Sequence, residues 1–126
     1  MGYRSQVVLA ISKHLTPFLT LATSQNAEAQ ALVFKHTDHF DRNYEGENSW
    51  LMTWDGIKWY ESYEDIQTLE KFIQEATSDE YSFEVDGKKQ SSSEHIKFVR
   101  VGEESGDIEM SGDGFWDIYT NTSICY

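Results

Sequence analysis

The stretch from Phe34 to Asp41, FKHTDHFD, brings two histidines and two aspartates into eight positions. Imidazole and carboxylate side chains are ligands of zinc and related metals, and a metal centre needs three or four of them at one point. The ligand candidates are His36, Asp38, His39 and Asp41. If they converged, the chain would be a small metal-dependent hydrolase.

The secondary structure of FKHTDHFD decides whether these side chains can meet. Three of the four apolar residues between positions 32 and 40 share one parity, which is typical of a strand with one buried face. On a strand, His36 and Asp38 point to one face. His39 and Asp41 point to the other, so at most two ligands lie on each side. We therefore predict no bound metal and no other cofactor, whereas a helix here would restore the hydrolase centred on His36 and His39.

Other catalytic motifs are absent from the sequence. It contains no GxSxG, no glycine-rich phosphate loop followed by lysine, and no motif around its single cysteine, Cys125. The acidic segment 103–117 also fails as a calcium loop. Counting from Asp107 puts Gly112 at the sixth place, but Ile118 occupies the twelfth, where glutamate is needed. We predict no catalytic residues and no enzymatic activity.

Capping signals and hydrophobic periodicity predict strands alternating with helices. Thr16 followed by Pro17 is typical of a helix start, because the first helical position needs no backbone N–H. Ser62 followed three residues later by Asp65 indicates a second start, and apolar residues then recur at helical spacing as far as Ala76. The expected helices span residues 17–30 and 63–77, and the expected strands span residues 5–12, 32–41, 50–60, 81–85, 95–101 and 115–126.

This order of elements predicts an α+β fold of the ferredoxin-like βαββαβ type. Two helices would cover one face of an antiparallel sheet, and an extra strand would follow at the C-terminus. With 126 residues, of which 39% are hydrophobic, we expect a single domain over residues 1–126. No apolar segment reaches the roughly 20 residues that span a bilayer, so we expect a soluble, cytoplasmic protein without membrane contact. The lone cysteine fits a reducing compartment.

The negative charge is concentrated in two blocks of the chain. The net charge is −12, and residues 41–80 carry eleven acidic against three basic side chains. Residues 101–126 carry six acidic side chains and no lysine or arginine. Such a surface repels a phosphate backbone, so direct nucleic-acid binding is disfavoured, whereas a basic protein surface would be attracted. The alternative is that the charge serves solubility alone.

The C-terminal acidic block and the aromatic run around position 54 are the candidate binding residues. The acidic side chains have no compensating cation within their own segment. Tryptophan dominates interface hot spots, although a tryptophan in a small domain can equally belong to the core. The predicted partner-binding residues are Glu103, Glu104, Asp107, Glu109, Asp113, Trp50 and Trp54.

Four segments carry a resemblance to a known group of proteins. They are MGYRSQVVLAI, IKWYESYEDIQTLEKFI, IKFVRVGEESGDIE and DIYTNTSI. The sequence resembles small uncharacterised proteins of tailed bacteriophages that open with MGYRS. The likeness extends over most of the chain but excludes FKHTDHFD and residues 80–94. It carries no catalytic residue onto this sequence, and it implies a phage accessory protein that acts in the bacterial cytoplasm.

Charge and resemblance together predict an inhibitor that binds a host or defence protein. Such targets include CRISPR and restriction nucleases, whose nucleic-acid channels are basic, and the acidic side chains would occupy such a surface. The alternative is a structural protein of virion assembly that forms a homodimer or larger homo-oligomer through the aromatic strand. The sequence leaves open whether the acidity mimics nucleic acid.

Overall fold

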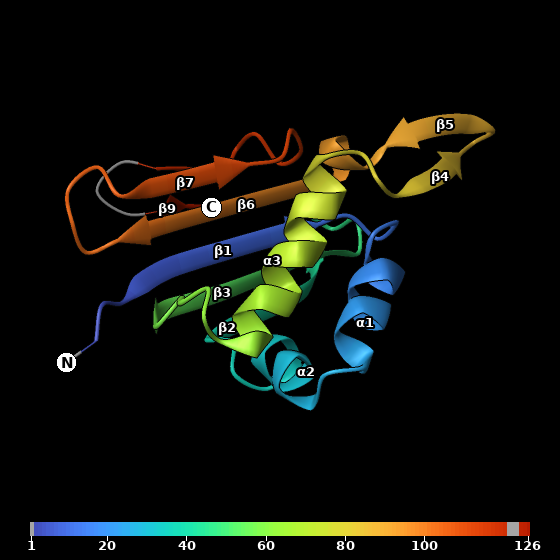
Figure 1. Ribbon diagram of the computed structural model, residues 1–126. Helices are drawn as coiled ribbons and strands as arrows, with labels where there is room; N and C mark the ends of the chain where they lie inside the picture. Colours follow the sequence, from blue (N-terminus) through green and yellow to red (C-terminus); the bar gives the residue numbers. More distant parts are fainter. Residues whose placement is uncertain (1, 121–123) are drawn as a thin grey trace.

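The protein contains a five-stranded antiparallel sheet (Figure 1). The computed structural model describes residues 2–120 and 124–126, without the side chain of Cys125. The strand order is β2-β3-β1-β6-β7. The strands are β1 (Ser5–Ile11), β2 (His39–Tyr44), β3 (Ser49–Ile57), β6 (Ile96–Gly102) and β7 (Ile108–Ser111). The prediction of an α+β fold with an antiparallel sheet is confirmed.

The central strand β1 is buried on both of its faces. Val7, Leu9 and Ile11 pack toward the helices, and Val8 and Ala10 pack toward the opposite layer. All five side chains are fully buried. A strand that is covered on both sides needs apolar residues at every position, which explains the continuous run VVLAI.

Three helices cover one face of the sheet, where two were expected (Figure 1). They are α1 (Thr16–Ser24), α2 (Ala27–Phe34) and α3 (Glu64–Thr77). Helix α3 matches its predicted range closely and buries Ile66, Leu69, Phe72, Ile73 and Ala76 against the sheet. Tyr63 precedes it as N-cap, without a side-chain hydrogen bond, so the cap expected from Ser62 does not form.

The helix predicted for residues 17–30 is interrupted at Asn26. This residue has extended backbone angles, and its side chain accepts a hydrogen bond from the Ala29 backbone N–H at 2.9 Å, so it caps a new helix. Helix α2 then continues to Phe34, where a strand was predicted. The strand expected at residues 32–41 was therefore wrong in its first half, and β2 begins only at His39.

The C-terminal segment covers the other face of the sheet. Ile118 and Ile124 pack against Val8, Ala10 and Val99. Its strands β8 (Tyr119–Thr120) and β9 (Ile124–Cys125) pair with each other and not with the main sheet. The extra strand of the main sheet is instead β7, which lies between the strands expected at residues 95–101 and 115–126.

A hairpin of β4 (Ser82–Val85) and β5 (Lys88–Ser91) extends beyond the main sheet and leads into the 3₁₀ helix η1 (Ser92–His95) (Figure 1). Its turn residues Asp86 and Gly87 both have positive φ, as a type I′ turn requires. Strand β5 thus lies between the strands expected at residues 81–85 and 95–101, where no strand was expected. Among the described residues, no helix is long and apolar enough to cross a membrane.

A matched pair of leucine substitutions tests this core. Leu69 on α3 is 0% exposed, whereas Leu21 on α1 is 67% exposed. We expect Leu69→Ala to lower the free energy of unfolding by about 2–5 kcal/mol, because it removes buried methyl groups and leaves a cavity. Leu21→Ala should change it by less than about 0.5 kcal/mol. Urea denaturation measures both values, and equal effects would contradict the described packing of α3.

Candidate protein-binding surface

Arg100 forms ion pairs with two of the five predicted acidic residues. Its guanidinium donates to Asp107 Oδ1 at 2.7 Å, to Asp107 Oδ2 at 3.2 Å and to Glu109 Oε1 at 2.9 Å. The Tyr3 hydroxyl donates to Asp107 Oδ2 at 2.6 Å. Arg100 lowers the pKa of Asp107, and Tyr3 lowers it further. The acidic segment itself contains no lysine or arginine, as stated above, but antiparallel pairing sets Arg100 of β6 opposite Glu109 and so brings in a cation from the neighbouring strand.

The other three predicted acidic residues are exposed but do not form one patch. Glu103 and Glu104 lie in the turn between β6 and β7, and Asp113 lies after the far end of β7. Among the described residues none of the three has a salt-bridge partner. The Glu104 backbone N–H donates to the Tyr3 hydroxyl at 2.8 Å, which holds this turn in place. Their role in partner binding stays a prediction.

The two predicted tryptophans have different environments. Trp54 is 1% exposed, and its indole N–H donates to the Leu32 carbonyl oxygen at 3.1 Å, so it belongs to the core and has no surface for a partner. Trp50 is half-buried, with its ring 5.2 Å from that of Phe40, and the Arg42 guanidinium lies 4.6 Å above Phe40. Only Trp50 can therefore contact a partner without rearrangement of the core.

The histidines of FKHTDHFD lie apart in secondary structure. His36 and Asp38 are in the loop between α2 and β2, whereas His39 begins β2. The Asp38 carboxylate accepts a hydrogen bond from the Asp55 backbone N–H at 2.7 Å, which ties the loop to β3. Across residues 2–120 and 124–126, no three His, Cys, Asp or Glu side chains come together as metal ligands.

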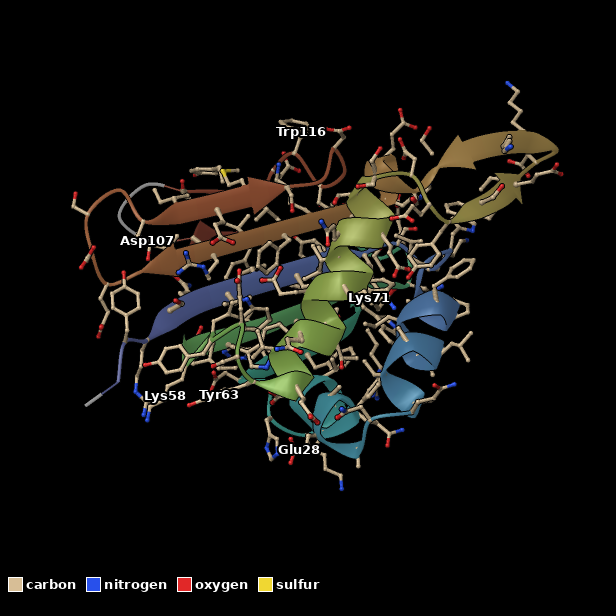
Figure 2. The ribbon with its side chains drawn as sticks, in the orientation of Figure 1. Glu28, Lys58, Tyr63, Lys71, Asp107 and Trp116 are labelled. Atoms are coloured by element: carbon tan, nitrogen blue, oxygen red, sulfur yellow. The ribbon has the colours of Figure 1, made fainter. Side chains whose placement is uncertain are left out.

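Trp116 is the most exposed large apolar residue that the structure describes, and the sequence analysis did not select it. It is 83% exposed and projects from the loop after β7 (Figure 2). The preceding Phe115 has φ of 51°, a region that bulky residues rarely adopt, and its ring packs 6.0 Å from that of Tyr44. The half-buried Phe115 thus holds the backbone that turns Trp116 outward.

Backbone contacts fix the loop that carries Trp116. The Asp113 N–H donates to the Ser93 carbonyl at 2.7 Å, and the Gly114 N–H donates to the Ile96 carbonyl at 3.1 Å. Gly112 has φ of 91° and lies so close to the Ile96 carbonyl that a side chain would collide with it. The loop is therefore preorganised, and a partner need not order it on binding.

Carboxylates from three separate segments surround Trp116. They line a hollow of about 240 Å³ together with Phe115 and come from the β2–β3 turn, from η1 and from the loop itself. All of them are exposed, and none forms a salt bridge within the described part of the chain. We call this set the Trp116 surface: Glu45, Glu47, Glu94, Trp116 and Asp117.

The Trp116 surface has the chemistry of a site for cationic side chains. A lysine or arginine can lie over the indole ring while a carboxylate pairs with its charge. The sequence features that could have indicated this site are the turn-prone stretches NYEGEN and SGDGFWD, each of which contains acidic residues. Nothing in either stretch indicated that the fold brings the two together.

Ser12 and His95 form a hydrogen-bonded pair at the border of this hollow. Ser12 Oγ lies 2.9 Å from His95 Nδ1, and Gln90 Oε1 lies 3.3 Å from His95 Nε2. Burial lowers the pKa of His95, and the nearby His14 lowers it further. The pair resembles a nucleophile with its base, but the second nitrogen faces a neutral amide instead of the carboxylate that stabilises an imidazolium. Its contacts join the end of β1 to β5 and η1.

Comparisons with protein-family models, curated proteins and solved structures found no match for this chain. The resemblance to phage proteins therefore stays a prediction. The interpretation of the Trp116 surface depends on its own exposure, charge and rigidity.

Asp107 provides a test of the Arg100 cluster through its pH dependence. We expect Asp107→Asn to lower the urea midpoint at pH 7, because it removes the charge that pairs with Arg100. The folded-state pKa of Asp107 is lowered, so its stabilisation is complete above the ordinary value of about 3.9 and is lost as the pH falls through the folded value. The difference between wild type and variant should shrink over that acidic range.

Glu103→Gln is the matched control for this test, because Glu103 is exposed and has no salt-bridge partner among the described residues. Its midpoint should follow that of the wild type at every pH. A midpoint difference for Asp107→Asn that persists unchanged into strong acid would contradict the assignment of the stabilisation to the ionised carboxylate.

Proposed function

We propose that the chain is an acidic protein-binding module that docks on a basic surface of another protein through Trp116. The observation that carries the proposal is an 83% exposed tryptophan on an anchored loop within a group of four carboxylates. Tryptophan is enriched at interface hot spots, and carboxylates around it favour a partner rich in lysine and arginine. The proposal includes no catalytic step.

The electrostatics support fast and selective association. A net charge of −12 on 126 residues attracts a basic protein over several ångströms and repels other acidic chains and nucleic acid. Exposed carboxylates act through solvent, so their contribution should weaken as salt screens it, with a screening length of about 8 Å at physiological ionic strength. Glu103, Glu104 and Asp113 would add to this long-range attraction although they lie outside the Trp116 surface.

At a finer level, we propose that the partner is a host or defence protein and that binding inhibits it. A CRISPR or restriction nuclease has a basic channel for nucleic acid, which an acidic rigid surface can occupy in place of the phosphates. The support for this step is the charge pattern and the resemblance to phage proteins, which also implies action in the bacterial cytoplasm.

A ferredoxin-like topology for four strands of the sheet belongs to the same proposal. Its support is the order β2-β3-β1-β6 within the sheet, with helices between β1 and β2 and between β3 and β6. On this view β7, the β4–β5 hairpin and the C-terminal segment are additions to a four-stranded unit. Because this topology occurs in proteins with many unrelated functions, it does not support the proposal that the chain is an inhibitor.

A structural role in virion assembly is the second candidate. The observation that favours it is the pair of exposed apolar residues Ile108 and Met110 on edge strand β7, which could join a second copy. The net charge opposes such self-association, since each copy carries −12. Measured molecular size separates the two candidates, because assembly requires an oligomer and docking on a basic partner does not.

Affinity capture with matched aromatic variants tests the proposed function. Tagged wild type, Trp116→Ala and Tyr63→Ala would be incubated with bacterial host lysate at low and high salt, followed by mass spectrometry. Tyr63 is also an exposed aromatic residue but lies at the other end of the sheet (Figure 2). We expect one basic protein to be captured at low salt, and Trp116→Ala to weaken its affinity at least about tenfold when it is purified. Tyr63→Ala should capture it normally.

Two results would contradict the proposal. Capture that is equally strong with Trp116→Ala would remove the proposed anchor. Recovery of the chain alone, together with an oligomer in sedimentation measurements, would favour assembly instead.

A further inference from the structure

The outer edge of β7 is open along the main sheet. Strand β7 pairs with β6 on its inner side, and no described strand pairs with its other side. The Gly102 N–H donates to the Asp107 carbonyl at 2.8 Å. In an antiparallel pair, residues whose backbone groups bond to the neighbouring strand alternate with residues whose backbone groups point away from it, so this bond fixes which residues of β7 point where. The C=O of Asp107 and the backbone groups of Glu109 therefore point toward β6, whereas Met110 directs its N–H and C=O to the open edge.

A groove of about 820 Å³ runs beside this edge, between β7 and helix α3. Helix α3 crosses the sheet and leaves β7 at its margin without a helix above it (Figure 1). Phe98 and Ile73 line the groove although each is only 3% exposed, and Gln67 and Gln74 contribute amide groups. An extended chain added to β7 would thus have one of its faces in this groove.

The groove carries an excess of negative charge. Glu61, Glu70 and Glu109 line it. The Trp59 indole N–H donates to Glu70 at 2.6 Å, while burial and then the charges of Glu109 and Glu61 raise the pKa of Glu70. The guanidinium of Arg100 pairs with Glu109 and Asp107, and its charge also lowers the pKa of Glu70. A cationic side chain of a bound partner would therefore be attracted to the groove.

Lys71 also lines the groove, but it does not balance these carboxylates. Its side chain is largely exposed, and its ammonium group lies 3.9 Å from Glu75 on the same helix. An exposed pair of this kind leaves the charge of the groove negative.

We propose that the β7 edge and its groove bind an extended segment of a partner protein in which basic and apolar residues alternate. Alternate side chains of a strand point to opposite faces. The basic set would meet Glu70 and Glu109 in the groove, and the apolar set would meet the exposed Ile108 and Met110 on the other face. The segment would become a sixth strand of the sheet.

The same features argue against a second copy as the occupant. Two β7 strands paired across a dyad would bring their Glu109 side chains together, and each chain carries −12. Strand β7 has only four residues, so backbone bonds alone give little affinity, and the side-chain contacts must select the partner. The groove lies apart from the residues of the Trp116 surface, so this site goes beyond the function proposed above.

A synthetic peptide probe tests the proposal on the whole protein. The probe is a fluorescent seven-residue peptide of alternating lysine and valine, and fluorescence anisotropy gives its Kd. Met110→Pro removes the N–H at the open edge but no bond to β6, so the fold should tolerate it. We expect this variant to weaken binding at least about tenfold, since the added strand loses a backbone bond and its fit to the edge.

The peptide itself supplies a test that does not alter the protein. N-methylation of its central residues keeps the lysine charges but blocks pairing with β7, and it should also weaken binding at least about tenfold. Equal affinity of the methylated and unmethylated peptides would show attraction by charge alone and overturn the proposal. Failure of the wild type to bind the unmethylated peptide would overturn it as well.

Charge-matched variants locate the binding site. Glu70→Gln should weaken peptide binding, whereas Glu28→Gln, which removes the same charge on α2 away from β7 (Figure 2), should leave it unchanged. Trp116→Ala should also leave peptide binding unchanged. A failed test of the β7 groove can therefore be distinguished from a failed test of docking through Trp116. Equal loss in Glu70→Gln and Glu28→Gln, or a wild-type dimer that Met110→Pro dissociates, would overturn the proposal.

Discussion

Burial of β1 on both faces is the constraint on which the rest of the structure depends. Its residues Val7 to Ile11 are fully buried, so the fold must supply an apolar layer on each side. The three helices supply one layer, and Ile118 and Ile124 of the C-terminal segment supply the other. Since apolar burial is the main favourable term in folding, the C-terminal segment is part of the core rather than a tail. The loop that precedes it, with Trp116, is thereby attached to the sheet at both ends.

Polar contacts then position the acidic residues that the core leaves on the surface. Arg100 and Tyr3 hold Asp107 at one end of β7, and the backbone of Ile96 holds Gly114 at the other. The same sheet therefore separates carboxylates that stabilise the fold from carboxylates that are free to meet a partner. This division gives the molecule rigid acidic surfaces, which lose little conformational entropy when they bind.

Much of the fold was predictable because its signals are local. The run VVLAI predicts a buried strand, and the helical spacing from Ile66 to Ala76 predicts α3. The interpretation of FKHTDHFD was less accurate, because Asn26 starts a second helix that overrides the strand pattern as far as Phe34. The candidate site was mostly missed: Trp54, chosen as a binding residue, is core, and Trp116, which was not chosen, is exposed.

The sequence by itself determined the α+β class, the strong negative charge and the absence of a recognised catalytic motif, since these follow from composition and short-range periodicity. Tertiary structure alone decided which charges are neutralised and which aromatic rings are exposed. Arg100 meets Asp107 and Glu109 only because β6 and β7 are paired. Glu45 and Glu94 line the same hollow as Trp116 only because the fold brings together three segments that are distant in the sequence. Such long-range neighbours depend on strand pairing and burial, which no local pattern contains.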